Sequence, residues 1–137
     1  MRVIVMDGQG GGFGKAIIEE IRKKIGEGPD ILALGTNALA TSQMLKAGAN
    51  EGATGENAIL VNALNADYII GSIAVLAADS MCGELTPVMA KAVADSPAKK
   101  ILIPLNRSRI YVMGVNSKPL PHYIDDVISF LKNSKKE

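Results

Sequence analysis

Short apolar runs alternate with helix-like stretches along most of this 137-residue chain. The runs at 3–6 and 31–34 are continuously apolar, which is typical of strands buried on both faces of a parallel sheet. Further strands are predicted at 66–71 and 100–105, and amphipathic helical patterns lie between the runs. This alternation predicts an α/β fold with three layers and a mainly parallel central sheet. A single domain over 1–137 is expected, because the length suits one core and no linker or repeat interrupts it.

Local signals mark several element boundaries. A helix is predicted over 38–47, and the glycine-rich connection after it contains a short edge strand at 51–54. Thr86 and Pro87 are typical of the N-cap and first position of a helix, which is expected to run to Asp95.

The C-terminal part of the sheet is predicted to be a hairpin. Strand-like runs at 100–105 and 110–115 are separated only by residues 106–109, which is too short for a parallel crossover. A final helix is expected to begin at Pro121.

The first strand is followed by a loop with five glycines within residues 8–14, directly before a helical pattern. The common dinucleotide pattern G-x-G-x-x-G and the P-loop pattern both fail here, whereas G-x-x-x-G-x-G fits at Gly8, Gly12 and Gly14. Glycines let the backbone approach a ligand, and the free amides of a helix N-terminus attract anions. The loop therefore predicts a Rossmann-like domain that binds a phosphate-bearing ligand, with a purely structural turn as the alternative.

This loop, with Lys15 and Ala16 after it, resembles the cofactor loop of short-chain dehydrogenases. The resemblance covers about residues 2–26 and implies NAD(P) or another nucleotide as the cofactor. Those enzymes use a Tyr-x-x-x-Lys pair, and none of the three tyrosines of this chain has a lysine four residues later. Dehydrogenase activity is therefore not expected, and the choice between NAD and NADP stays open.

Ligands of a Rossmann-like sheet lie over the carboxyl ends of its strands. Thr36 and Asn37 follow the second strand and are candidates for a ribose contact, with Asn37 as a helix N-cap as the alternative. The predicted cofactor-binding residues are Gly8, Gln9, Gly10, Gly11, Gly12, Phe13, Gly14, Thr36, Asn37 and Ser72.

The densest group of reactive side chains lies in the segment 79–84, after the strand at 66–71. Asp79 and Glu84 are candidates for a general acid or base, and Cys82 near a helix start is a candidate nucleophile. Arg107 is a candidate clamp for a phosphate or carboxylate. The alternatives are a solvated or capping role for the two carboxylates, a buried inert role for Cys82, and surface solvation or a subunit contact for Arg107. The predicted substrate-side residues are Asp79, Ser80, Cys82, Glu84, Asn106 and Arg107.

Composition excludes several classes of function. Fifteen basic and fourteen acidic residues give a formal net charge of +1 without a basic stripe, so nucleic acid is not an expected partner. Cys82 and His122 are the only residues of their types, too few for a histidine–cysteine zinc site. No uncharged run reaches the roughly 18 residues of a membrane helix, so a cytoplasmic protein without a membrane partner is expected. A homodimer or higher homo-oligomer would protect the sheet edges.

Most of the chain also resembles a small uncharacterised bacterial family, a domain of unknown function. The resembling stretches are DGQGGGFGKAII, ALGTNALATSQMLKAGAN, GATGENAI and SPAKKILIPLNR. The resemblance implies no established activity. Three interpretations stay open: a nucleotide-binding module, a small enzyme that uses segment 79–84 beside its cofactor, and an assembly subunit without a ligand.

Overall fold

The computed structural model describes residues 1–105 and 109–134. Its centre is a five-stranded sheet in which every neighbouring pair is parallel, in the order β3-β2-β1-β4-β5. The strands are β1 (Arg2–Asp7), β2 (Asp30–Gly35), β3 (Glu51–Thr54), β4 (Tyr68–Ser72) and β5 (Lys99–Ile103). The predicted α/β class with a parallel central sheet is confirmed.

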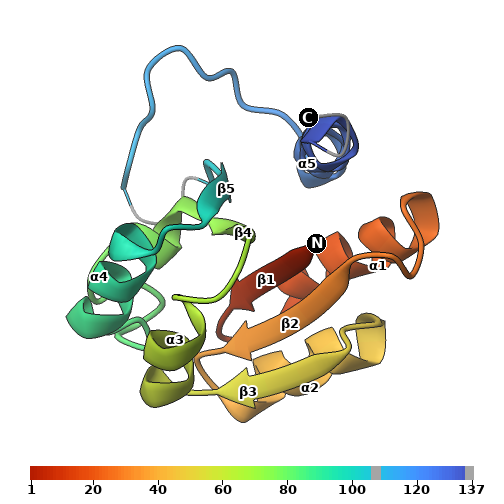
Figure 1. The fold of residues 1–137 in the computed structure, drawn as a ribbon. Coiled ribbons are helices and arrows are strands. Elements are labelled where there is room, and N and C mark those ends of the chain that lie inside the picture. The colour runs from red at the N-terminus through yellow and green to blue at the C-terminus, as the bar shows by residue number, and fades with distance from the viewer. Residues whose placement is uncertain (106–108, 135–137) are drawn as a thin grey trace.

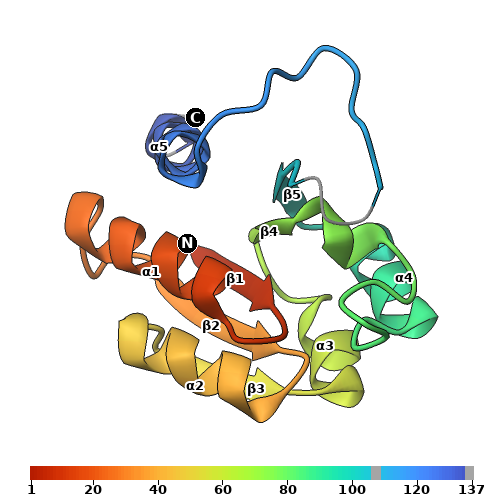
Figure 2. The same ribbon diagram turned by 180° about the vertical axis from the view of Figure 1, so that it is seen from behind.

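Helices cover both faces of the sheet (Figures 1 and 2). On one face, α1 (Gly12–Lys24), α2 (Ala38–Ala47) and α5 (Leu120–Ser134) supply the buried partners of the odd-numbered β1 residues Val3 and Val5. On the other face, α3 (Glu56–Asn62), the short 3-10 helix η1 (Ile73–Leu76) and α4 (Pro87–Asp95) pack on Ile4 and Met6. The alternation of faces along one apolar strand explains why β1 contains no polar residue between its ends.

Several of these elements lie where local sequence signals predicted them. The helix predicted at 38–47 is α2, and the predicted edge strand at 51–54 is β3. Thr86 is the N-cap of α4, where its hydroxyl accepts a hydrogen bond of 3.1 Å from the Met89 N–H, and Pro87 is the first helical residue.

The predicted C-terminal hairpin is not observed. Within the described part of the chain after β5, residues 110–115 form no strand. A turn between Val112 and Val115 interrupts the run, and Gly114 has a φ of 87°. The β-branched and aromatic residues here favour a strand only where a partner strand is available.

Instead of a hairpin, residues 109–119 arch away from the body before α5 returns to pack beside α1 (Figures 1 and 2). An ion pair of 2.9 Å between Lys24 Nζ and Asp125 Oδ1 joins α1 to α5. Among the described residues, none of the helices combines the length and the apolar character needed to cross a bilayer.

Candidate functional site

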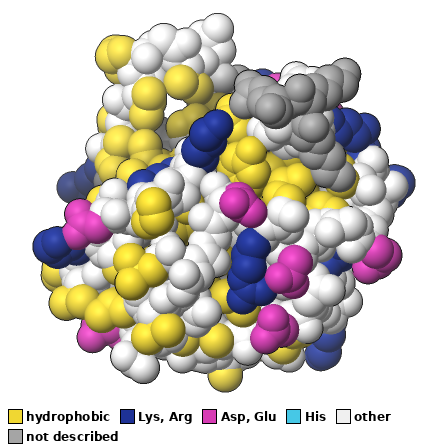
Figure 3. All heavy atoms as spheres, in the orientation of Figure 1, with side chains coloured by type: hydrophobic (Ala, Val, Ile, Leu, Met, Phe, Trp, Pro, Cys, Tyr) yellow, Lys and Arg dark blue, Asp and Glu magenta, His cyan; other side chains and the backbone are white. Residues whose placement is uncertain are grey.

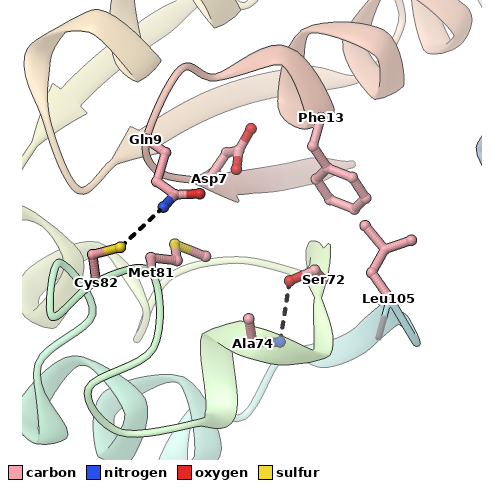
Figure 4. Close-up of a pocket in the computed structure, with 8 residues that line it drawn as sticks. All are labelled: Asp7, Gln9, Phe13, Ser72, Ala74, Met81, Cys82 and Leu105. Atoms are coloured by element: carbon pink, nitrogen blue, oxygen red, sulfur yellow. Dashed lines mark hydrogen bonds between the residues drawn. The ribbon is translucent and has the colours of Figure 1, made fainter. Parts of the chain in front are cut away.

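The strand order reverses between β1 and β4, because the chain proceeds from β1 towards β3 on one side and from β4 towards β5 on the other. Such a switch point is where the carboxyl ends of parallel strands leave a crevice for ligands. A cavity of about 220 Å³ lies there (Figure 4). It is lined by Asp7, Gln9, Phe13, Ser72, Ala74, Met81, Cys82 and Leu105.

A second hollow of about 360 Å³ lies along the glycine loop itself. It is lined by Asp7, by the loop residues 8–12, by Phe13 and by the apolar side chains of Leu105 and Leu120. The two hollows share Asp7, Gln9, Phe13 and Leu105, so they adjoin. Together they form what we call the switch-point groove, which has a polar floor and apolar walls.

The glycines of the loop have different tasks. A Cβ on Gly11 would lie 2.7 Å from the Ala40 Cα, and one on Gly14 would lie 2.5 Å from the Met44 sulfur, so both allow α1 to pack closely on α2 and the sheet. In contrast, a Cβ on Gly10 or Gly12 would meet nothing within 4 Å. Tight packing therefore does not explain Gly10 and Gly12, which face open space.

Asp7 organises the loop, and the sequence analysis did not single it out. Its carboxylate accepts hydrogen bonds of 2.7 Å from the N–H of Gly8 and of 2.7 Å from the N–H of Gly14, and the residue is buried. Its position in the sequence could have indicated this role, because a carboxylate between a strand and a helix start is placed to accept the free N–H groups of the first helical turn. Asp7 thus stabilises the first turn of α1 from inside the protein.

Other amides of the loop stay available. No hydrogen bond links the N–H groups of Gly10, Gly12 and Phe13 to another residue of the described ranges. Two of these residues lack a side chain that would cover the backbone. The loop therefore offers hydrogen-bond donors towards the switch-point groove in addition to those that Asp7 uses.

Glu84 closes the side of the crevice that lies over β2. Its Oε1 accepts hydrogen bonds from the Gln9 N–H at 2.9 Å, the Thr36 hydroxyl at 2.7 Å and the Asn37 amide at 2.7 Å. These donors, the Gln9 N–H first, lower the pKa of Glu84 below its ordinary value. Asn37 is also the N-cap of α2, because its Oδ1 accepts from the Ala40 N–H at 2.9 Å. The alternative prediction for Asn37, that it caps a helix, is therefore confirmed.

The lowered pKa of Glu84 predicts a pH-dependent contribution to stability. The ionised form is favoured by folding, so the contribution is complete above the ordinary pKa of 4.5 and is lost as the pH falls through the lower folded-state pKa. Urea unfolding should show that Glu84→Gln lowers the free energy of unfolding near neutral pH, and that the difference from the unmodified protein shrinks below pH 4.5. A difference that stays constant down to pH 2 would contradict this assignment.

The other residues of the predicted substrate side do not form one reactive group. Cys82 is exposed and lines the 220 Å³ cavity, where its sulfur lies 3.8 Å from Gln9 Nε2 (Figure 4). The Ser80 hydroxyl donates to the Ala74 carbonyl at 2.8 Å, and Asp79 lines neither hollow of the groove. The segment is tightly turned, since Asp79, Met81 and Cys82 all have φ values between 57° and 66°. Only Cys82 of this segment's predicted residues therefore faces the groove.

The remaining predicted residues divide between the groove and the undescribed part of the chain. Ser72 lines the cavity from the end of β4, and its Oγ also accepts the Ala74 N–H at 3.1 Å as the N-cap of η1. Asn106 and Arg107 lie outside the described residues. Within the described ranges, histidine, cysteine and carboxylate side chains form no group of three that would hold a metal ion.

Comparison with known proteins agrees with the fold and gives the family. A solved structure titled a dodecameric FMN-dependent UbiX-like decarboxylase from Escherichia coli O157:H7 is similar over 100% of this chain and 96% of that one, with a TM-score of 0.56 and 15% sequence identity. At that identity the likeness concerns the fold alone. No curated protein sequence matches the chain significantly. The likeness of the glycine loop to that of short-chain dehydrogenases stays an interpretation of the pattern. A family model matches residues 2–136, so the chain belongs to the family described as a domain of unknown function, DUF3842.

Proposed function

We propose that this protein binds a phosphate-bearing mononucleotide cofactor, with FMN as the first candidate, in the switch-point groove. The observation that carries the proposal is the loop at residues 8–13, where Gly10 and Gly12 face open space and the N–H groups of Gly10, Gly12 and Phe13 donate to no described residue. Backbone donors at the start of a helix are suited to a phosphate.

The groove also has the size and lining that a flat ring system needs. Its two hollows of about 220 and 360 Å³ together fall within the usual range of small-molecule sites, roughly 300–1,000 Å³. Phe13, Met81 and Leu105 supply apolar walls, and Ser72 supplies a hydroxyl (Figure 4). The neighbour of similar fold is itself described as FMN-dependent, which supports a flavin over the NAD(P) suggested by the glycine pattern.

The Asp7 carboxylate lines both hollows and opposes an anion in this place. Its negative charge is offset by the N–H groups of Gly8 and Gly14, both at 2.7 Å, so the loop has already compensated for it. The residues that would hold the cofactor are therefore Gly10, Gly12 and Phe13 for the phosphate, with the apolar walls for the ring.

A bound flavin would supply one- and two-electron redox chemistry, while the protein supplies binding and orientation. We propose binding rather than a particular reaction, because Glu84 and Ser80 direct their hydrogen bonds to the chain itself. A reaction beside the cofactor is the second candidate, and the observation that favours it is that Cys82 and Ser72 line the same cavity.

A thermal-shift comparison of FMN, riboflavin, NAD and ATP tests the proposal. FMN should raise the melting temperature by several degrees, and riboflavin, which lacks the phosphate, should raise it much less, since stabilisation follows the affinity of the ligand for the folded state. Stabilisation by riboflavin equal to that by FMN would show that the glycine loop does not bind the phosphate. No stabilisation by either flavin would contradict the proposal that the protein binds FMN.

We further propose that the protein self-associates through the arching segment at residues 109–119. Tyr111 is 70% exposed and Met113 is 84% exposed, and Val112 and Val115 are exposed beside them. Figure 3 shows hydrophobic side chains at the upper left of the molecule, among white atoms, in the region where this segment lies in Figure 1. An apolar cluster of this kind is a common mark of a protein–protein interface, and the FMN-dependent neighbour is described as a dodecamer.

Light scattering after gel filtration should therefore give a mass above one chain for the unmodified protein. The double variant Tyr111→Ser, Met113→Ser should shift the mass towards the monomer, because both side chains leave water only in the assembly. Leu64, an exposed residue in the turn after α3, provides a control, since Leu64→Ser alters an apolar surface residue elsewhere and should leave the mass unchanged. A monomeric unmodified protein would contradict the proposal.

A further inference from the structure

We infer that Glu84 restricts the site to mononucleotides, because its side chain fills the part of the crevice over β2 that the second half of a dinucleotide would need. The inference rests on the proposed cofactor site and names which ligands that site accepts. In doubly wound sheets a dinucleotide lies across the switch point, and a residue near the end of the second strand binds the ribose of one half. In this chain that position is occupied by Thr36 and Asn37.

The donors that a second ribose would use are already committed. The Thr36 hydroxyl and the Asn37 amide both donate to Glu84 Oε1 at 2.7 Å. The Asn37 amide also donates to the Gln9 carbonyl at 2.9 Å, which ties the end of β2 to the glycine loop. A dinucleotide would have to break this network and remove a carboxylate from it.

The network packs closely against the start of the glycine loop. A Cβ on Gly8 would lie 2.7 Å from the Met81 sulfur and 3.2 Å from Glu84 Oε1, so the space above the start of the loop is filled. Thr36, Asn37 and Glu84 line neither hollow of the switch-point groove. The groove consequently extends from β1 towards β4, β5 and α5, and not towards β2.

The segment that carries Glu84 is anchored on both sides of it. Leu85 is fully buried, and its carbonyl accepts the Asp79 N–H at 2.7 Å. The Ser80 hydroxyl donates to the Ala74 carbonyl at 2.8 Å. The backbone at Glu84 is thus held over β2 by its neighbours, and a ligand that displaces the carboxylate must break its hydrogen bonds to Gln9, Thr36 and Asn37.

The test compares the affinities of FMN, FAD and ADP-ribose for the unmodified protein, Glu84→Ala and Glu84→Gln, measured by calorimetry. FAD carries the FMN half plus a second nucleoside half, and ADP-ribose lacks the flavin. The unmodified protein should bind FAD and ADP-ribose at least about tenfold more weakly than FMN. Glu84→Ala should tighten FAD and ADP-ribose by about tenfold while FMN changes by less than about threefold. Glu84→Gln keeps the size and an acceptor oxygen, so it should keep the preference for FMN.

The outcomes separate this inference from the proposed function. If FMN binds but Glu84→Ala leaves FAD and ADP-ribose as weak as before, the role of Glu84 is overturned and the cofactor site stands. If FMN does not bind but Glu84→Ala gains affinity for ADP-ribose, the proposal of FMN as cofactor is wrong, and the inference that Glu84 blocks the part of the crevice over β2 stands. Equal affinity of the unmodified protein for FMN and FAD would also overturn the inference. Should Glu84→Ala fail to fold, Glu84→Asp shortens the side chain by one methylene and must give a smaller gain in the same direction.

Discussion

Replacing Asp7 with alanine is expected to lower the free energy of unfolding by about 2–4 kcal/mol. The buried carboxylate accepts from the N–H groups of Gly8 and Gly14, and its loss leaves both donors without their partner at the first turn of α1. Each such hydrogen bond to a charged group is worth about 1.5–3 kcal/mol, and relaxation of the loop towards water recovers part of it. Urea unfolding followed by circular dichroism measures the loss.

Asp67→Ala is the matched control for Asp7. Asp67 is exposed, and within the described part of the chain its side chain accepts a single backbone N–H, that of Arg2 at 2.8 Å. Its replacement should cost about 1 kcal/mol or less, because water replaces the lost acceptor. Equal losses for the two variants would show that Asp7 does not organise the glycine loop.

Gly11→Ala is expected to cost about 3 kcal/mol of stability, whereas Gly10→Ala should change it by no more than about 0.5 kcal/mol. Gly11 has a φ of 75°, and a Cβ there would lie 2.7 Å from the Ala40 Cα and 3.0 Å from the Ala40 carbonyl oxygen. The overlap is with the backbone of α2, which has no flexible end that moves aside. A Cβ on Gly10 meets nothing within 4 Å, so Gly10→Ala is the control that makes the same chemical change without the overlap.

Urea unfolding of the two variants side by side provides the measurement. If Gly10→Ala and Gly11→Ala are equally destabilised, the division of the loop into packing glycines and ligand-facing glycines is wrong. If both are neutral, the close approach of the loop to α2 is absent in solution.

The sequence predicted the elements whose signals are local. The start of α4 is marked by Thr86 and Pro87, and β1 by its continuous apolar run, so these elements follow from neighbouring residues alone. The hairpin prediction failed because a strand also needs a partner: Ile110, Tyr111 and Val112 have strand-forming side chains, but the structure provides no strand beside them within the described residues.

The candidate site was predicted only in outline, for a related reason. The glycine loop and the ends of β2 and β4 were expected to meet, because the carboxyl ends of parallel strands share one edge of the sheet. The place of Glu84 was not predictable, since it binds Thr36 across 48 residues and only the packing of segment 79–85 brings the two together. Asp7 was within reach of sequence reasoning, because it ends β1 and precedes the loop directly.

Flavin fluorescence titration of the unmodified protein and of Gly12→Asp tests the central claim most directly. Gly12 is the first residue of α1 and faces open space, so aspartate fits there, and a carboxylate at a helix N-terminus stabilises the helix by about 0.3–1 kcal/mol. The variant should therefore fold at least as stably while its new charge repels the phosphate. The account predicts saturable FMN binding by the unmodified protein and a loss of about 100-fold in affinity for Gly12→Asp. Absence of FMN binding by the unmodified protein, or equal affinity of the two proteins, would contradict it.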